Sequence, residues 1–365
     1  MKFVCSGISL AEAVMKTSKA CPARTTAPIL ECIKIKASVN EVEFLATDGE
    51  LSIRRVLKAE VFEEGEACVP GKLFADFIGK LSDLEITVHT VENRMELHYG
   101  DSASNLQTLP AEEFPKINFE IGENYFVMKR SALKKVVAET VFCCAQDDSR
   151  PILKGCLFDM KENLEVTALD GYRLALSTAE ILSKNAQKSV ICPARTLTEI
   201  SRMLPDGDEE VTVYTQGGML LVGTEDFTIV SRLYQGEFIR KENVVPAAFA
   251  TTVTVNRAEL IASVERAAIL IRGDKNNLIT LDVVSNLLRI SATSDIGKVD
   301  ETVRVMTDGA ELVISMNAKF LLDALRALEE EDVVLSFNGP ISPFILQNVQ
   351  KKDSLYLILP VRNAQ

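Results

Sequence analysis

Ala46-Thr47-Asp48-Gly49 recurs along this chain as Ala168-Leu169-Asp170-Gly171 and, more loosely, as Ala292-Thr293-Ser294-Asp295. The three copies begin 122 and 124 residues apart. Asp-Gly after an apolar stretch is typical of a tight turn between two strands. A catalytic aspartate is the alternative, but recurrence at matching positions favours the turn. The chain therefore repeats a structural unit about every 123 residues.

A helix-like block repeats with the same period. Lys72-Leu73-Phe74 corresponds to Arg195-Thr196-Leu197 and to Lys319-Phe320-Leu321, at offsets of 123 and 124 residues. A carboxylate and a second basic residue follow each copy: Asp76 and Lys80, Glu199 and Arg202, Asp323 and Arg326. A strand-like signal also repeats, with Leu109 and Phe114 matching Leu233 and Phe238. We expect three similar domains, at residues 1–120, 121–246 and 247–365.

Each repeat combines hairpin and helix patterns, which predicts an α+β fold. Alternating apolar residues predict antiparallel strands at 42–46, 51–54, 85–89, 95–99, 210–214, 219–222 and 333–337. Two helices are expected in each repeat, at 10–20 and 72–81, at 131–143 and 196–204, and at 257–270 and 318–328.

The predicted helices carry apolar side chains on one face and basic ones on another. In the last helix, Leu321 and Leu325 oppose Lys319 and Arg326. A basic face is ordinary on one solvated helix, but six helices in register that each carry Lys or Arg are harder to explain as solvated faces in an acidic protein. The recurring carboxylates Asp76, Glu199 and Asp323 are expected on the same polar face and weaken that signal.

Composition describes an acidic globular chain of 365 residues, with 47% hydrophobic residues and a formal net charge of −12. Net charge governs solubility, whereas binding depends on where the charges lie, so a nucleic-acid partner is not excluded. No run of about 18 apolar residues is present, and residues 1–7 do not resemble a secretion signal. We expect a cytoplasmic protein that does not enter a membrane.

Catalytic and metal-binding patterns are absent from the sequence. His89 and His98 are the only histidines, and no phosphate-binding glycine loop or hydrolase elbow occurs. We therefore expect no enzyme activity, no metal and no cofactor. The eight cysteines have apolar flanks and no C-x-x-C spacing, so they should be reduced and buried. A redox pair formed by Cys143 and Cys144 is the alternative.

Three motifs resemble the bacterial DNA polymerase III β subunit, the sliding-clamp family. They are Ser149-Arg150-Pro151-Ile152-Leu153-Lys154-Gly155, Ala168-Leu169-Asp170-Gly171-Tyr172-Arg173-Leu174-Ala175 and Leu357-Ile358-Leu359-Pro360-Val361-Arg362. Arg24 to Leu30 matches the family as well. The resemblance covers the whole chain and implies a head-to-tail homodimeric ring, with helices lining a hole for duplex DNA and sheets outside. It implies a processivity factor, whose partners are double-stranded DNA, the replicative polymerase, the clamp loader, and other polymerases and repair proteins.

DNA contact in such a ring needs diffuse attraction to phosphates and few base contacts. The helix faces and, by resemblance, two rim loops supply the candidates. Arg24 can equally belong to a turn before Pro28. The expected DNA-binding residues are Arg24, Lys72, Lys80, Lys134, Lys135, Arg150, Arg195, Arg202, Arg266, Lys319 and Arg326.

The resemblance also implies a pocket between the second and third repeats that binds short peptide motifs. Its expected lining is Leu153, Gly171, Tyr172, Arg173, Leu174, Ile239, Val244, Leu357, Leu359, Pro360, Val361 and Arg362. The same tail can also be simply the last strand. The expected dimer contacts are Ser104, Asn105, Leu106, Ile269 and Leu270.

The connector departs from the family pattern, because Phe238 is followed by Ile239-Arg240-Lys241-Glu242-Asn243 where Pro-Asp-Tyr is usual. Leu359 stands where methionine is common, and Glu139 stands where the other first helices carry Lys16 and Arg266. The main alternative is a repeat-built scaffold that binds peptides without encircling DNA. An enzyme on the same repeats is a more distant alternative.

Overall fold

The computed structural model describes residues 1–81, 85–185, 189–272 and 277–362. It contains two compact units. The first comprises Met1–Arg130, Leu182–Ala186 and Thr198–Leu233, and the second comprises Ser131–Ile181, Gln187–Leu197 and Tyr234–Gln365. Both units take residues from the middle repeat, because each contains a sheet that continues from one repeat into the next.

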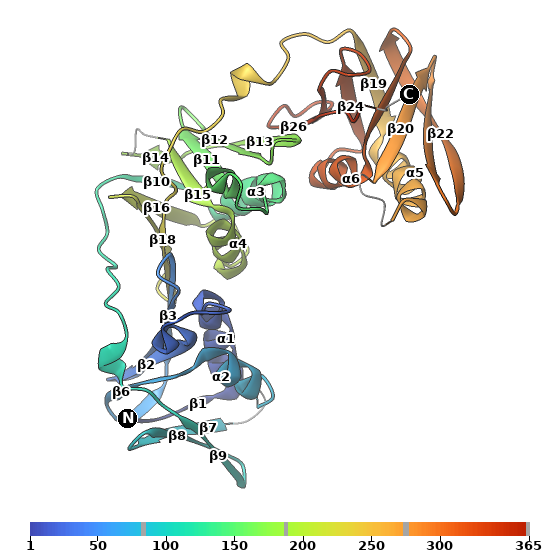
Figure 1. Cartoon of the computed structure of the whole chain (residues 1–365). Coiled ribbons are helices and arrows are strands. Elements are labelled where there is room, and N and C mark those ends of the chain that lie inside the picture. Colours follow the sequence, from blue (N-terminus) through green and yellow to red (C-terminus); the bar gives the residue numbers. More distant parts are fainter. Residues whose placement is uncertain (82–84, 186–188, 273–276, 363–365) are drawn as a thin grey trace. The chain divides into compact units, whose positions relative to one another are not determined.

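The first two repeats have the same order of helices and strands, and the last repeat has one strand fewer (Figure 1). The first repeat contains β1 (Lys2–Ser6), α1 (Gly7–Thr17), β2 (Cys32–Ser38), β3 (Glu41–Thr47), β4 (Leu51–Lys58), β5 (Glu60–Glu63), β6 (Gly65–Pro70), α2 (Gly71–Ile78), β7 (Glu85–Val91), β8 (Arg94–Tyr99) and β9 (Ser102–Gln107). The middle repeat contains β10 (Tyr125–Lys129), α3 (Arg130–Thr140), β11 (Gly155–Met160), β12 (Leu164–Leu169), β13 (Arg173–Ala179), β14 (Ser183–Lys184), β15 (Val190–Pro193), α4 (Ala194–Met203), β16 (Glu210–Gln216), β17 (Met219–Gly223) and β18 (Phe227–Arg232).

The last repeat contains β19 (Thr251–Asn256), α5 (Arg257–Leu270), β20 (Leu278–Val284), β21 (Leu287–Ser294), β22 (Gly297–Gly309), β23 (Leu312–Asn317), α6 (Ala318–Ala327), β24 (Asp332–Phe337), β25 (Phe344–Asn348) and β26 (Ser354–Ile358). The predicted strands and helices therefore exist. Two first helices are shorter than expected, because 3₁₀ turns at Ser18–Ala20 and Val141–Cys143 replace their last turns.

Antiparallel sheets join neighbouring repeats. One sheet has the order β14-β10-β16-β17-β18-β4-β3-β2-β6, so that β18 of the middle repeat pairs with β4 of the first. Another has the order β15-β11-β12-β13-β26-β25-β24-β19-β22-β21-β20-β23, in which β26 of the last repeat pairs with β13 of the middle one. The remaining sheet, β5-β1-β7-β8-β9, ends at β9. Each joint is thus made of backbone hydrogen bonds as well as packed side chains.

The repeated Asp-Gly forms the same turn twice. Asp48 accepts hydrogen bonds through Oδ1 from the backbone nitrogens of Glu50 and Leu51, at 2.9 and 2.8 Å. Asp170 does the same for Tyr172 and Arg173, at 2.8 and 3.0 Å. The glycine that follows has a φ of +92° at Gly49 and +94° at Gly171, which glycine adopts without strain. The turn prediction is confirmed, and these aspartates shape a hairpin.

The apolar helix faces form the cores. Leu321 and Leu325 of α6 are fully buried, whereas Lys319 and Arg326 are exposed. In the same way α4 buries Leu197 and Ile200 and exposes Arg195 and Arg202. Helices α1 and α2 pack side by side in the first unit, as α5 and α6 do in the second.

Two details of the sequence prediction are wrong. Glu199 is 7% exposed and lies at the buried edge of α4 rather than on its polar face. Phe114 and Phe238 lie beyond β9 and β18, in the connectors between repeats. Phe114 packs with Cys32, Leu45 and Cys68, and Phe238 packs against a cluster that includes Leu174 and Leu357. Their common spacing reflects a repeated anchor for the connector, which an apolar residue provides without being in a strand.

Candidate functional site

Five of the predicted DNA-binding residues have no ion pair or side-chain hydrogen bond within the described part of the chain. They are Arg24, Lys72, Lys80, Arg150 and Lys319, and all five are exposed. Lys72 and Lys80 lie at α2 and just after it, Lys319 begins α6, and Arg150 precedes a 3₁₀ turn at Pro151–Lys154. Such cations can approach a phosphate without first breaking a contact.

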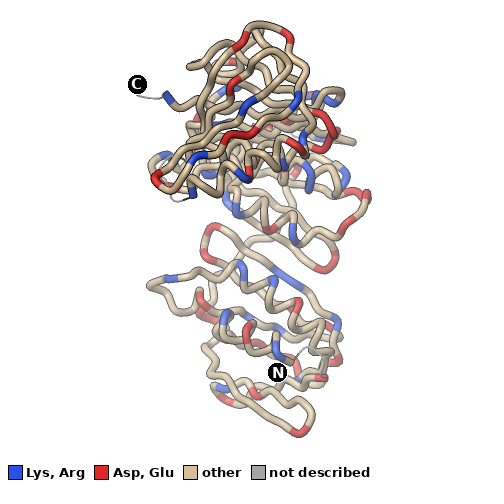
Figure 2. Tube along the Cα trace, turned by 90° about the vertical axis from the view of Figure 1, so that its right-hand side faces the viewer, with Lys and Arg blue, Asp and Glu red and all other residues tan. Residues whose placement is uncertain are grey.

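Three exposed arginines are instead paired with carboxylates. Arg202 contacts Glu199 at 2.9 Å, Arg326 contacts Glu265 at 2.7 Å, and Arg266 donates from Nε and Nη2 to both oxygens of Glu301 at 2.8 and 2.6 Å. Lys and Arg are interleaved with Asp and Glu along the trace of each unit (Figure 2). Exposed pairs contribute about 0–1 kcal/mol each, so these arginines can change partner at little cost. Lys134 and Arg195 also lie on α3 and α4.

Lys135 differs from the other cations because three carboxylates surround it. Its Nζ lies 3.0 Å from Asp353, 3.4 Å from Glu329 and 3.6 Å from Glu139. Partial burial alone would lower the pKa of Lys135, but the Asp353 hydrogen bond and the nearby carboxylates raise it above its ordinary value. Burial raises the pKa of Glu139, against a hydrogen bond from Ser177 and the charge of Lys135. This set ties α3 to the segments beside β24 and β26.

Arg173 forms another ion cluster in the same unit, and this one is buried. Only 8% of its surface is exposed, and Nε contacts Asp170 at 3.0 Å while Nη1 contacts Asp323 at 2.7 Å. Its Nη2 donates to the carbonyl oxygen of Phe142 at 2.7 Å. The guanidinium carbon also lies 4.5 Å from the ring centroid of Phe320. Arg173 therefore joins β13 of the middle repeat to α6 of the last one and has every donor group directed at protein.

The predicted pocket residues separate into a buried and an exposed set. Leu153, Leu174 and Leu357 are 2%, 3% and 4% exposed and belong to one apolar cluster that the connector residues Phe238, Val245 and Phe249 cover. The exposed set is Tyr172, Ile239, Val244 and Leu359, at 65%, 36%, 38% and 36%. Gly171 and Arg362 are exposed, and Pro360 and Val361 are half-buried. The buried residues therefore form a packed layer that supports the exposed apolar side chains.

Backbone hydrogen bonds fix the tail beyond the last strand. The nitrogen of Leu359 donates to the oxygen of Tyr172 at 2.9 Å, and that of Val361 donates to the oxygen of Ser315 at 2.8 Å. Leu109 and Tyr234 make corresponding bonds to Cys68 and Ile191 in the other repeats. The tail therefore leaves β26 at Ile358 and runs to β23, the strand of the same repeat that contains Ser315. This path places Leu359 beside Tyr172.

Besides the sheet ends at β5, β6, β14, β15 and β23, two strand edges have no neighbouring strand in the described chain. β9 pairs with β8 alone, and residues 297–304 of β22 pair with β21 alone. The predicted dimer residues lie at these edges. Ser104, Asn105 and Leu106 belong to β9, whereas Ile269 is 68% exposed near the end of α5 and Leu270 lies beside Gly297. An uncovered edge presents a row of free backbone donors and acceptors to a further strand.

All eight cysteines are free and buried, as expected. The close thiol pair is Cys144 with Cys156, whose sulfurs lie 3.5 Å apart, and not Cys143 with Cys144. Within the described ranges, no group of three His, Cys, Asp or Glu side chains is arranged to hold a metal ion. No described helix is long and apolar enough to cross a membrane.

Family comparison covers almost the whole chain. The models of the DNA polymerase III beta subunit match in order: the N-terminal domain at residues 1–118, the central domain at 127–239 and the C-terminal domain at 242–362. The chain belongs to the DNA polymerase III beta subunit family. It has the family's three-domain α+β clamp fold.

Individual relatives agree with this assignment. The beta sliding clamp of Staphylococcus epidermidis is 31% identical over 358 residues, with 95% of each chain covered. That of Halalkalibacterium halodurans is 30% identical over 99% of this chain and all of the relative. The crystal structure of the Bacillus subtilis sliding clamp superposes with a TM-score of 0.93 at 30% identity, covering 100% of this chain and 99% of that one. A Pseudomonas aeruginosa clamp solved with griselimycin superposes at 0.92 with 28% identity, and both chains are fully covered.

Sequence reasoning assigned no partner to Arg173, because Asp323 is 150 residues away along the chain. The sequence did contain one sign of this partner, a carboxylate that recurs on the second helix of each repeat as Asp76, Glu199 and Asp323. Only the last of these meets a buried arginine. Phe249, which also helps to cover the apolar cluster, was not among the residues that the sequence analysis selected.

Removing Asp323 should destabilise the protein more than removing its repeat counterpart. Asp323→Ala leaves the buried Arg173 with one carboxylate fewer, and breaking a buried pair in this way costs about 3 kcal/mol or more. Asp76→Ala removes an exposed carboxylate at the corresponding helix position and should change the free energy of unfolding by less than about 0.5 kcal/mol. Urea unfolding of both variants measures the difference. Equal effects would show that the Arg173 ion pairs do not hold this joint.

Proposed function

We propose that this clamp-family protein is a non-catalytic DNA polymerase processivity factor that closes around duplex DNA as a head-to-tail ring of two chains. This proposal rests on the strand edges. The edges of β9 and β22 that have no neighbouring strand correspond to edges that are already paired within the chain. β4 and β13 each pair with the last hairpin strand of the next repeat, β18 and β26 respectively. Their counterparts β22 and β9 each have an edge without a neighbouring strand among the described residues. A second copy therefore satisfies both by repeating the same joint.

The two joints within the chain share one register. Ser52 and Leu174 lie six residues after the repeated Ala46 and Ala168, and they face Val230 and Leu357. Val230 and Leu357 in turn lie four residues before Tyr234 and Val361, which make the corresponding tail bonds. Applied to β22 and β9, the same two offsets give Lys298, which lies six residues after Ala292, and Asn105, which lies four residues before Leu109. This supports a joint between chains in which Lys298 faces Asn105.

DNA binding is proposed for the exposed basic residues near the helices and rim loops. The unpaired set, Arg24, Lys72, Lys80, Arg150 and Lys319, would bind phosphates directly, and Lys134, Arg195, Arg202, Arg266 and Arg326 would add to it. Lys135 would serve mainly as a structural cation. A net charge of −12 disfavours DNA binding elsewhere on the protein, so that binding is confined and independent of base sequence.

Partner binding is proposed for the exposed apolar group Tyr172, Ile239, Val244 and Leu359, with Val361 beside it. The replicative polymerase, the clamp loader, and other polymerases and repair proteins would insert a short apolar motif there. Leu153, Leu174 and Leu357 would support this surface from below. Arg173 would shape it, since its donors are already engaged.

The domain boundaries after residues 120 and 246 fall in the connectors: the first follows the N-terminal match, which ends at 118, and the second lies four residues after the start of the C-terminal match at 242. We propose that each stretch is one clamp domain and that the protein works in the cytoplasm, where replication occurs in bacteria. A peptide-binding scaffold that does not encircle DNA remains the competing function. Retention on nicked circular plasmid, with release after linearisation, separates the clamp from that scaffold.

The strand register between chains can be tested by cross-linking. Lys298→Cys combined with Asn105→Cys should form a covalent dimer on oxidation, because directly opposed β residues have Cβ atoms about 5 Å apart. Val299→Cys with Asn105→Cys is the matched control, since neighbouring strand residues point to opposite faces. Non-reducing electrophoresis gives the yield. Equal yields from the two pairs would contradict this register.

Unpaired cations should matter more for DNA retention than paired ones. Lys72→Gln with Lys319→Gln removes two unpaired charges and should reduce the log–log salt slope by about 0.9 for each phosphate that is no longer neutralised. Arg202→Gln with Arg326→Gln removes the same net charge from two ion pairs and should reduce the slope less. Retention on nicked circular plasmid across a salt series measures both. An unchanged slope in both variants would mean that these faces do not meet DNA.

Leu359→Asp should abolish polymerase stimulation while leaving the ring and DNA retention intact. A charge in the centre of a small apolar contact should cost about 2 kcal/mol or more, or roughly thirtyfold in affinity. Ile341→Asp is the control, because this side chain is 63% exposed in the same repeat and outside the proposed surface. Primer extension with a DNA-loaded clamp measures stimulation. Normal stimulation by a folded Leu359→Asp ring would place the partner site elsewhere.

A further inference from the structure

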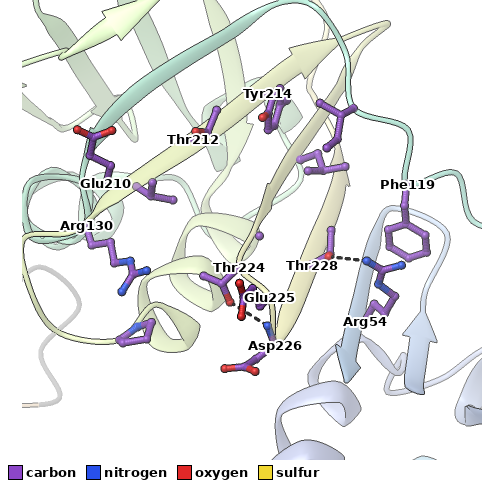
Figure 3. A pocket seen from close by; sticks show the side chains of 15 residues that line it. Arg54, Phe119, Arg130, Glu210, Thr212, Tyr214, Thr224, Glu225, Asp226 and Thr228 are labelled. Atoms are coloured by element: carbon purple, nitrogen blue, oxygen red, sulfur yellow. Dashed lines mark hydrogen bonds between the residues drawn. The ribbon is translucent and has the colours of Figure 1, made fainter. Parts of the chain in front are cut away.

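A cleft of about 690 Å³ lies over the joint sheet of the first unit, apart from every site discussed above (Figure 3). Its floor crosses four neighbouring strands, with Thr212 on β16, Gly223 on β17, Thr228 on β18 and Arg54 on β4. Arg54 donates from Nη2 to Thr228 Oγ1 at 3.1 Å. The volume is within the range of ordinary ligand sites.

The connector forms an apolar wall beside this floor. Phe119 lies over Arg54, with the guanidinium carbon 4.7 Å from the ring centroid, and this contact holds the arginine in place. Ile121 lines the cleft and is 65% exposed, although the nearby Leu221 and Tyr214 offer apolar surface. An exposed isoleucine beside a concave apolar surface leaves room for another apolar side chain.

Two arginines line the cleft, and each has one long ion pair within the chain: Arg54 Nη1 lies 3.8 Å from Glu43, and Arg130 Nη1 lies 3.4 Å from Glu209. Figure 3 shows Arg130 entering on one side of the view and Arg54 with Phe119 on the other, with Thr228 and the loop Thr224–Asp226 between them. The Nε atoms of Arg54 and Arg130 are both shielded from solvent and have no acceptor among the described residues. A ligand in the cleft does not reach these shielded Nε atoms, but its oxygen acceptors can compete with Glu43 and Glu209 for the Nη groups, because partly exposed ion pairs of this length contribute little.

The remaining charges select the class of ligand. Glu210, Glu225 and Asp226 also line the cleft, which gives three carboxylates against two guanidiniums. The excess of carboxylates repels nucleic-acid phosphates, whereas a ligand with both acidic and basic groups can pair with both kinds of side chain. Four strands at about 4.8 Å spacing span about 14 Å, which equals about four residues of extended peptide.

We propose that this cleft binds an extended peptide segment of a partner protein, about four residues long, with an acidic side chain for Arg54 and Arg130. An apolar side chain would pack on Ile121 and Leu221, and a basic one would meet the Glu225 and Asp226 carboxylates. This site is distinct from the Leu359 surface in the last repeat. It gives the clamp a second kind of docking segment, recognised by mixed charge rather than by apolar anchors alone.

The full-length protein, labelled at isoleucine methyl groups, provides the test. The probe is the peptide acetyl-Lys-Ile-Glu-Leu-amide, and the matched control peptide carries Gln in place of Glu. The Ile121 methyl signal should shift and saturate with the acidic peptide, with at least tenfold weaker binding of the Gln peptide. No saturable shift at millimolar peptide, or equal binding of the two peptides, would overturn the proposal.

Variants of the cleft complete the experiment. Arg130→Gln should weaken binding of the acidic peptide at least tenfold, whereas Lys129→Gln should leave it unchanged, since Lys129 pairs with Asp208 and does not line the cleft. Ile121→Asp, measured by calorimetry, should also weaken it and cannot disturb the core, because the side chain is exposed. The molecular mass of the assembled ring in solution should be the same for all three variants as for the parent protein. Parent-like affinity in both Arg130→Gln and Ile121→Asp would overturn the proposal.

Discussion

Pairing of strand edges is the constraint on which this structure depends. A repeat of this kind cannot complete its own sheets, because a strand such as β4 or β13 has a neighbour on one side only until the next repeat supplies β18 or β26. An unfilled edge exposes backbone groups that bind another strand or aggregate. Three repeats in one chain fill two such joints and leave β9 and residues 297–304 of β22 uncovered. We propose that a second chain closes these two edges in the same way.

This constraint also explains why the functional surfaces are positioned by joints. The Arg173 cluster and the carboxylates around Lys135 both connect α3 or β13 of the middle repeat to segments of the last repeat. They accompany the β13–β26 ladder and hold Tyr172 and Leu359 in contact through a backbone hydrogen bond. In the first unit, the β4–β18 ladder brings Arg54 opposite Thr228 and creates the floor of the mixed-charge cleft. Each proposed peptide surface therefore lies at a joint between repeats.

Local patterns in the sequence predicted local structure well. The recurring Asp-Gly turns, the hairpins and the amphipathic helices could be found because their signals lie within a few residues. Features that depend on partners far away along the chain were not predicted, such as Asp323 opposite Arg173, burial of Glu199, or Cys156 beside Cys144. The spacing of Phe114 and Phe238 was correct as a repeat but wrong as a strand, since periodicity shows that a residue recurs without showing its backbone conformation. The family resemblance supplied the ring, and the strand edges supply the physical reason for it.

Hydrogen exchange at the free edges tests this account most directly. The parent protein should be compared with Ile269→Asp/Leu270→Asp, a variant expected to be monomeric because Leu270 lies beside Gly297 of β22 and its neighbour Ile269 is 68% exposed. Amides along Ser102–Gln107 and residues 297–304 should be protected in the parent at high concentration, and should exchange rapidly on dilution and in the variant. Amides of β4 and β18 should stay protected throughout. Rapid exchange of β9 and β22 in the parent at every concentration, or undiminished protection in a monomeric variant, would contradict closure by strand pairing.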